Sequence, residues 1–218
     1  MTNAVLFDAV CWDWNGTLLN DVEVARAAMN TVLQHRELAV IPDDESYRRI
    51  FGFPISEFYG RLGLSGDSFG DAADHYLRLF AGSVGRASLQ PDAEATLAAI
   101  GGLGVEQVLI SATPIDVLEA QLSPHGLSAH FSRVLGITDV YAASKAHVVD
   151  SWLQEAGHDP DRVLMVGDTN HDEETAEALD VHFIRFDKGH QQQSSERSRY
   201  PVIDDLREVV SYLLRANI

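Results

Sequence analysis

The stretch AVCWDWNGT, residues 9–17, decides the fold. Four apolar residues run directly into Asp13, and Asn15, Gly16 and Thr17 suit a turn. A short apolar run that ends in a polar turn is typical of a buried strand in a parallel sheet, and functional residues gather beyond the carboxyl ends of such strands. We therefore expect Asp13 to be a reactive side chain at a strand end.

Similar apolar runs recur along the chain, and each is expected to add a strand to the same sheet. They are residues 105–110, 133–135, 162–166 and 181–186. Helical patterns separate these runs: Pro91 and Pro114 suit first helical positions, Thr113 suits a helix cap, and Ser144 can cap a helix that holds Lys145. The alternation predicts an α/β protein with a doubly wound, parallel, Rossmann-like sheet.

Residues 20–87 break this rhythm, because they contain helical patterns and no convincing strand. The helical patterns are residues 22–36, 43–50, 55–62 and 66–84. We expect an inserted α-helical domain at 20–87 and an α/β core domain made of 1–19 and 88–218. The polar stretch at 187–199 is expected to be an exposed loop before a last helix at 204–214.

Composition excludes several classes of function. The formal net charge is -17 at pH 7 and the basic residues are scattered, so a nucleic-acid partner is not expected. The single cysteine, Cys11, cannot form an internal disulfide, and no apolar stretch is long enough to cross a bilayer. We expect a cytoplasmic protein without membrane contact, in which an anionic substrate needs a cation inside the site.

The candidate reactive residues follow four of the predicted strand ends and helix starts. Asp13 is a carboxylate nucleophile, Ser111 and Lys145 can hold phosphate oxygens, and Asp168 and Asp172 can hold a metal ion with Asp13. The amides of the Gly16–Thr17 turn can add donors to a phosphate. This set predicts phosphoryl transfer through an aspartyl phosphate, with Mg²⁺ as the cofactor and a small phosphorylated metabolite as the substrate.

The same residues resemble the four motifs of the haloacid dehalogenase superfamily, in order and over nearly the whole chain. Asp13 to Thr17 matches the aspartate-x-x-glycine-threonine motif, Ser111 the second motif and Lys145 the third. Gly167, Asp168 and Asp172 match the fourth motif. The resemblance implies a phosphatase with a helical cap, similar to phosphoglycolate-phosphatase-like members, and a Mg²⁺ ligand in the backbone carbonyl at position 15.

Asn15 departs from the pattern, because family phosphatases usually carry a second aspartate there as general acid and base. An amide cannot shuttle a proton at neutral pH, and general acid–base catalysis commonly contributes about 10²- to 10⁴-fold. Three interpretations remain open: an activated substrate such as an acyl phosphate, a slow phosphatase with a substitute acid, or a protein that binds phosphate without rapid turnover. Asn is also simply at home in turns.

The inserted helices are expected to select the substrate. Arg49 and Arg61, with Arg48, are candidates for a substrate carboxylate or second phosphate. Candidates for an apolar wall are Phe53, with Phe51, Phe58 and Tyr59. His190 is expected at the rim of the site. Nothing in the sequence separates a monomer from a homodimer.

Two alternatives to a phosphatase remain. A haloacid dehalogenase needs no acid for a halide, which suits Asn15, but the carboxylates at 168 and 172 favour Mg²⁺, which that reaction does not use. A catalytically weakened phosphate-binding or regulatory protein would keep the site and lose turnover. The intact set of nucleophile and metal carboxylates favours an enzyme.

Overall fold

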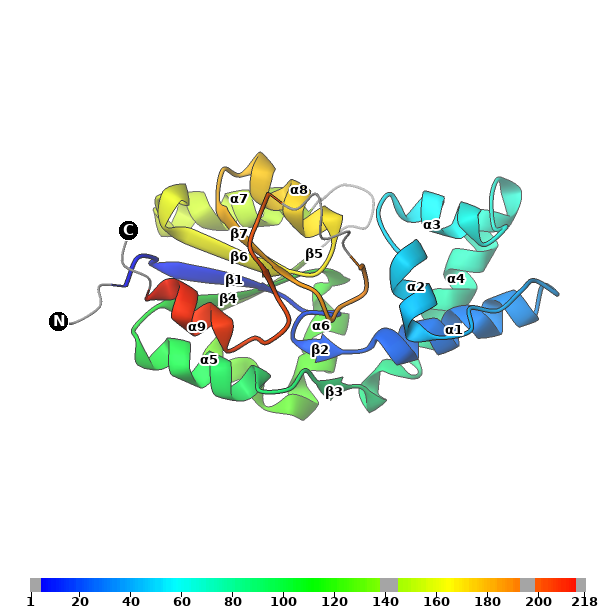
Figure 1. Cartoon of the computed structure of the whole chain (residues 1–218), viewed down its shortest axis with the longest axis horizontal. Helices are drawn as coiled ribbons and strands as arrows, with labels where there is room; N and C mark the ends of the chain where they lie inside the picture. Colours follow the sequence, from blue (N-terminus) through cyan, green and yellow to red (C-terminus); the bar gives the residue numbers. More distant parts are fainter. Residues whose placement is uncertain (1–4, 138–144, 193–198, 215–218) are drawn as a thin grey trace.

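The computed structural model describes residues 5–137, 145–192 and 199–214. Figure 1 shows an α/β core and, at one end of it, a group of helices, α1–α4. The two parts meet at the carboxyl ends of the core strands, so the candidate residues lie between them.

The core is one six-stranded sheet whose paired neighbours all run parallel, in the order β5-β4-β1-β6-β7-β8. Its strands are β1 (Ala9–Asp13), β4 (Glu106–Pro114), β5 (Arg133–Ile137), β6 (Val163–Gly167), β7 (His182–Phe186) and β8 (Val202–Ile203). The chain moves from β1 to β4 and β5 on one side and then returns to β6 on the other. This reversal beside β1 is the place where ligands bind in open α/β sheets.

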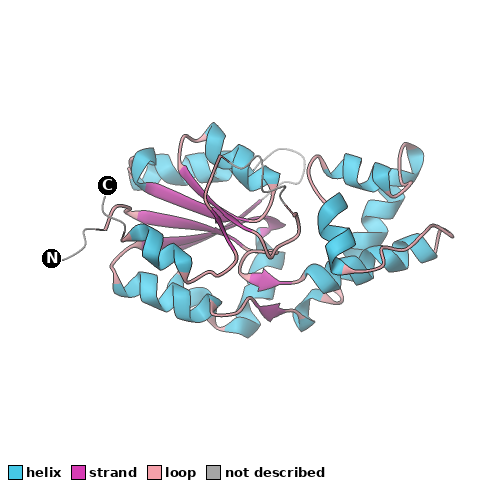
Figure 2. Cartoon of the chain, viewed as in Figure 1, coloured by secondary structure: helices cyan, strands magenta, loops and turns pink. Residues whose placement is uncertain are grey.

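Helices cover both faces of the sheet (Figure 2), which confirms the predicted doubly wound fold. In β1, Val10 and Trp12 pack on the face of α5 (Ala93–Gly102) and α9 (Glu208–Leu213), while Ala9 and Cys11 pack on the face of α7 (Lys145–Ala156) and α8 (Asn170–Ala178). Alternate residues point to opposite faces of a strand, so burial on both faces requires the continuous apolar runs seen in the sequence.

The inserted segment consists of α1 (Val22–Gln34), α2 (Asp44–Ile50), α3 (Ile55–Arg61) and α4 (Asp67–Ala81), followed by a 3₁₀ turn at Val84–Arg86. These helices bury an apolar core of their own, which includes Met29, Leu33 and Phe58. A two-stranded antiparallel ribbon of β2 (Leu19–Asn20) and β3 (Ser88–Leu89) carries the chain into and out of the helices. We call α1–α4 and their connections the cap.

Several local expectations were wrong. Thr113 does not cap a helix, because β4 continues to Pro114 and α6 (Ile115–Leu122) begins one residue later. Pro91 lies before α5, whose N-cap is Asp92 in a left-handed conformation. Strand β8 was not expected, since two residues give too short a pattern. The proposed cap at Ser144 lies outside the described residues. No helix among those described has the length and apolarity needed to cross a bilayer.

Candidate functional site

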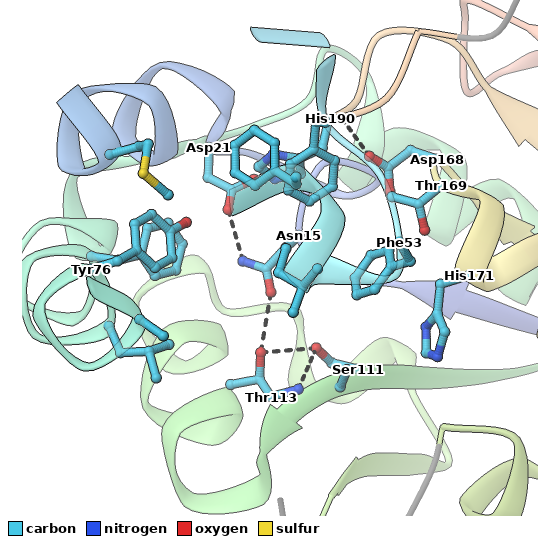
Figure 3. Close-up of a pocket in the computed structure, with 18 of the residues that line it drawn as sticks. Asn15, Asp21, Phe53, Tyr76, Ser111, Thr113, Asp168, Thr169, His171 and His190 are labelled. Carbon is cyan, nitrogen blue, oxygen red and sulfur yellow. Dashed lines mark hydrogen bonds and ion pairs between the residues drawn. The ribbon is translucent and has the colours of Figure 1, made fainter. Parts of the chain in front are cut away.

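The strand ends bring the predicted residues to one cavity of about 380 Å³ between the core and the cap. Asp13 ends β1, Asp168 follows β6, and Lys145 and Asp172 come from the first turns of α7 and α8. Ser111 lies within β4, and all five side chains line the cavity. Figure 3 shows the part of this cavity around Asn15, Ser111 and Asp168.

Lys145 joins two of the carboxylates. Its ammonium donates to Asp13 Oδ1 and, at 2.5 Å, to Asp172 Oδ1, and all three residues are buried. Burial raises the pKa of Asp13 well above its usual range, and Asp172 and Asp168 raise it further, against the opposing effect of Lys145. A nucleophilic Asp13 carboxylate therefore needs more positive charge than Lys145 alone supplies.

Asp172 is held by hydrogen bonds at the start of α8. Its Oδ2 accepts from the Thr169 amide at 3.0 Å, the Thr169 hydroxyl at 2.7 Å and the Asp168 amide at 3.2 Å. Burial alone would raise its pKa, but Lys145 and the hydrogen bonds from Lys145 and Thr169 lower the pKa overall. Asp172 thus accepts four hydrogen bonds from protein donors, whereas Asp168 accepts two, so Asp172 is better placed to act on a metal through water than directly.

Backbone atoms lie close against the Asp168 carboxylate. Its Oδ1 accepts from the Thr17 hydroxyl at 3.2 Å and its Oδ2 from the His190 amide at 2.5 Å. Gly16, at φ +81°, and Gly189 both lie so near that a Cβ on either would collide with Oδ2. Burial raises the pKa of Asp168 to about 6, with His190 opposing this shift.

The three carboxylates fit a divalent cation. Asp13, Asp168 and Asp172 are buried, and one oxygen from each lies within 4.8 Å of the others. Hard ions such as Mg²⁺ prefer oxygen ligands and usually keep several waters. Lys145 contacts two of the three and cannot neutralise them all, so a bound cation would offset the burial and the mutual repulsion that raise the pKa values of Asp13 and Asp168.

A second network surrounds Asn15. The Asn15 amide donates to Asp21 Oδ2 at 2.8 Å, while Asp21 Oδ1 accepts from the Gly16 amide at 2.8 Å and lies 3.0 Å from His190 Nε2. Asp21 is fully buried. Burial opposes charge on His190, but the Asp21 carboxylate raises its pKa to about 9. The other ring nitrogen lies 3.1 Å from the Tyr47 hydroxyl of the cap.

This network changes two expectations. The Gly16 amide is engaged with Asp21 and with the Leu19 carbonyl, so it is not available to a phosphate. His190 is buried and does not lie at the rim. Sequence reasoning missed Asp21, because an aspartate before a helix is ordinarily a cap, and its partner His190 lies 169 positions away.

Ser111 is linked to Asn15 through Thr113. The Ser111 hydroxyl donates to Thr113 Oγ1 at 3.1 Å, and the Thr113 hydroxyl donates to Asn15 Oδ1 at 3.3 Å (Figure 3). The chain of hydroxyls fixes Asn15 from the side opposite Asp21. The Asn15 side chain is thereby oriented by a carboxylate on its nitrogen and a hydroxyl on its oxygen.

Of the predicted substrate residues in the cap, the aromatic ones line the cavity: Phe51, Phe53, Phe58 and Tyr59. The Phe53 ring stacks on His171 with 4.8 Å between centroids. Arg49 pairs with Glu45 and Arg61 with Glu57, each one turn away on its own exposed helix face. Neither arginine lines the cavity. Both arginines form i,i+4 ion pairs on the protein surface and do not face the site.

The cap is joined to the core by the polar segment after β7, which was expected to be an exposed loop. Arg48 Nε donates to the Gly189 carbonyl at 2.9 Å, and its Nη2 donates to the Lys188 carbonyl at 3.0 Å. Asn170 pairs with both backbone groups of Phe53 at 3.0 Å. Residues 187–192 therefore contact the cap and the site; residues 193–198 lie outside the described part of the chain.

Comparisons with known proteins identify the family of the chain. The sequence profile of the family described as haloacid dehalogenase-like hydrolase matches residues 10–186. A comparison with curated protein sequences finds no significant match.

Three solved structures illustrate the shared fold. A haloacid dehalogenase-like family hydrolase from Streptococcus pneumoniae is 20% identical, with a TM-score of 0.81 over 96% of this chain and 99% of that chain. A predicted phosphoglycolate phosphatase from Haemophilus somnus 129PT is 17% identical, with a TM-score of 0.73 over 95% and 98%. Protein tyrosine kinase A from Mycobacterium tuberculosis is 23% identical, with a TM-score of 0.80 over 96% and 99%.

These structural likenesses show the fold, and the profile match covers most of the chain, from β1 to the end of β7. It includes Asp13, Ser111, Lys145, Asp168 and Asp172, the residues that meet at the cavity. The chain belongs to the haloacid dehalogenase-like hydrolase family.

Proposed function

We propose that the protein is a Mg²⁺-dependent phosphatase that hydrolyses a small phosphorylated metabolite through an aspartyl phosphate on Asp13. One observation carries the proposal: Asp13, Asp168 and Asp172 form a buried carboxylate cluster, joined by Lys145, at one end of the cavity. Structural neighbours named as a haloacid dehalogenase-like hydrolase and a phosphoglycolate phosphatase support the reaction class.

The residues of the chain suit a two-step displacement. Asp13 Oδ1 is held by Lys145, and no described residue hydrogen-bonds Oδ2, which leaves this oxygen to attack phosphorus. The bond between phosphorus and the leaving oxygen breaks, and water then hydrolyses the aspartyl phosphate to release inorganic phosphate and restore Asp13. Ser111 and Lys145 donate to the phosphoryl oxygens, where charge redistributes during the transfer.

Asp13 and Asp168 would hold Mg²⁺ directly, together with the backbone carbonyl of Asn15, and Asp172 would act through water. When bound, the ion would neutralise the carboxylate cluster and let a phosphate dianion approach. The raised pKa of Asp13 makes this neutralisation necessary, because a protonated carboxyl is a poor nucleophile.

The side-chain amide of Asn15 cannot donate a proton to the leaving oxygen, so the reaction is fastest with leaving groups that depart without being protonated. The surroundings of Asn15 support this interpretation, because Asp21 and Thr113 already hold both ends of its amide. An aryl or acyl phosphate meets that condition better than a simple alkyl phosphate.

The test is phosphate release from p-nitrophenyl, acetyl and ethyl phosphate, with and without Mg²⁺. Asp13→Asn should abolish release, and acid-quenched native protein should carry a phosphoryl group on Asp13 by peptide mass spectrometry. Asp8→Asn is the matched control, since Asp8 lies before the other end of β1, paired with Arg162 on the surface. Mg²⁺-dependent binding of phosphate without release from any ester would instead support a phosphate-binding protein.

A further inference from the structure

The cavity does not end at the carboxylates but extends into the cap, where aromatic side chains form its wall. Phe51, Phe53 and Phe58 come from α3 and the turn before it, and Tyr59, Phe69 and Tyr76 come from α3 and α4. Phe51 with Phe58 and Tyr59 with Phe69 lie 5.1 Å apart between centroids, at interplanar angles of 62° and 80°, so the rings pack edge to face as one wall.

The cavity is large enough for a ring. An engineered apolar cavity of about 150 Å³ in another protein binds benzene, whereas this cavity measures about 380 Å³ with its carboxylate end included. A phosphoryl group at Asp13 and an aromatic ring against the cap wall can therefore occupy it together. Figure 3 shows Phe53 and Tyr76 on either side of Asn15, within the same cavity.

The charges in the cavity disfavour an acidic leaving group. None of the described residues that line it is an arginine, and Lys145 is held by Asp13 and Asp172. His190 is paired with the buried Asp21. The arginines of α2 and α3 that could have met a substrate carboxylate contact surface glutamates or the 188–189 backbone instead.

We propose that the substrate is a phosphate monoester whose leaving group is an uncharged aromatic ring system, bound against the aromatic wall of the cap. This inference rests on the proposed phosphatase function and names its substrate class. It separates the protein from a phosphoglycolate phosphatase, whose substrate carries a carboxylate on the leaving group. Aromatic rings pack favourably on the edges and faces of other rings, and a carboxylate there would lose its hydration without gaining a cation.

Position 15 favours the same class. A phenol has a pKa of about 10, far below the pKa of about 15.7 of water, so an aryl oxygen leaves without protonation far more easily than an alkyl oxygen. An aromatic ester therefore fits both the wall of the cap and the absence of a general acid at Asn15.

The experiment separates ring binding from leaving-group chemistry by using two esters with alkyl oxygens. We would measure kcat/KM for benzyl and ethyl phosphate, with phenyl phosphate and phosphoglycolate alongside, in MgCl₂. Burial of a ring side chain predicts a preference for benzyl over ethyl phosphate of roughly 10- to 100-fold, expressed mainly in KM. Phosphoglycolate should be the poorest of the four.

A cation placed at the wall should reverse the preference. Leu77 lines the cavity and is 59% exposed on α4, so Leu77→Arg adds a charge without burying it. This variant should raise kcat/KM for phosphoglycolate and lower it for benzyl phosphate. The matched control is Val40→Arg, which adds the same charge to an exposed cap position that does not line the cavity, and it should leave all four values unchanged.

Each outcome is decisive. If the native protein hydrolyses ethyl phosphate or phosphoglycolate as efficiently as benzyl phosphate, with Asp13 required, the phosphatase function stands and the aromatic substrate class is wrong. An unchanged substrate order in Leu77→Arg also contradicts the placement of the leaving group against this wall. If no ester releases phosphate in MgCl₂, the proposed function fails, and the substrate class fails with it.

Discussion

Among single residues, Asn15 and Asp21 form a complementary pair of hydrogen-bond donor and acceptor. The Asn15 nitrogen donates to Asp21 Oδ2, while Asp21 Oδ1 serves the Gly16 amide and His190. An aspartate at position 15 would place a carboxylate oxygen against Asp21 and remove the donor. The amide therefore has a structural reason to be there, separate from any effect on chemistry.

Asn15→Asp is accordingly expected to lower the free energy of unfolding by about 1–3 kcal/mol at pH 7.5, because a charged hydrogen bond is replaced by repulsion. The double variant Asn15→Asp with Asp21→Asn should recover part of the loss, since the new amide can donate where Asp21 Oδ2 accepted. Urea unfolding of the three proteins measures this.

The pH dependence of the single variant provides a check. Repulsion between the two carboxylates raises the pKa of one of them in the folded state, so the folded protein binds more protons than the unfolded chain. The penalty should therefore shrink as the pH falls from 7.5 toward 5. A penalty that stays constant over this range, or a double variant less stable than the single one, would contradict the reciprocal pairing.

Gly189 packs closely against the Asp168 carboxylate. A Cβ there would collide with the Asp168 carboxylate, whose Oδ2 accepts the His190 amide one residue later. Gly189→Ala should destabilise the protein by about 1–3 kcal/mol and weaken Mg²⁺ binding. Gly60→Ala is the control, because its Cβ would meet no atom within 4 Å in α3, and helical propensity favours alanine by roughly 0.5–1 kcal/mol. Thermal unfolding that ranks the two variants equally would refute the close packing around Asp168.

At the scale of elements, α2 links the cap to the segment after β7. Arg48 donates twice to carbonyls of residues 188 and 189, whereas its neighbour Arg49 donates to Glu45 and Ser46 within α2. Arg48→Ala should therefore speed hydrogen exchange of the amides in 187–192 and destabilise the protein by about 1–2 kcal/mol. Arg49→Ala removes the same side chain from the same helix and should change neither quantity.

The elements also show how far the sequence could predict the molecule. Strand β1 and the position of Asp13 follow from a local pattern, since two buried faces require an apolar run and the site requires a polar residue at its end. Helix α2 was predicted, but not which of Arg48 and Arg49 faces the core, because that choice depends on packing against the 187–192 segment. The pair of Asp21 and His190 was missed for the same reason: its partners meet only through the fold.

At the level of the whole molecule, the net charge and the carboxylate cluster should respond differently to added salts. With a formal net charge of -17, like charges across the surface repel one another, and any salt screens that repulsion. The cluster of Asp13, Asp168 and Asp172 is buried and needs a cation at one place. Stabilisation by Mg²⁺ should therefore exceed stabilisation by KCl at the same ionic strength.

The size of the effect follows from binding linkage. A ligand at 100 times its Kd stabilises the folded state by about 2.7 kcal/mol, and for a chain of this length 1 kcal/mol moves Tm by roughly 2–4 °C. MgCl₂ at such a concentration should thus raise Tm by roughly 5–10 °C above the KCl reference. The pKa of Asp168 is about 6 and that of Asp13 is raised, so Mg²⁺ must displace protons at low pH, and the Tm difference should be larger at pH 7.5 than at pH 5.5.

Asp168→Asn separates site binding from screening, because it removes one ligand charge and changes the net charge by a single unit. The variant should keep the response of the native protein to KCl and lose most of the additional response to MgCl₂. If the Mg²⁺ response survives in Asp168→Asn, or if KCl reproduces it in the native protein, the ion acts on the surface charge, and the buried cluster is stabilised by protons and Lys145 alone.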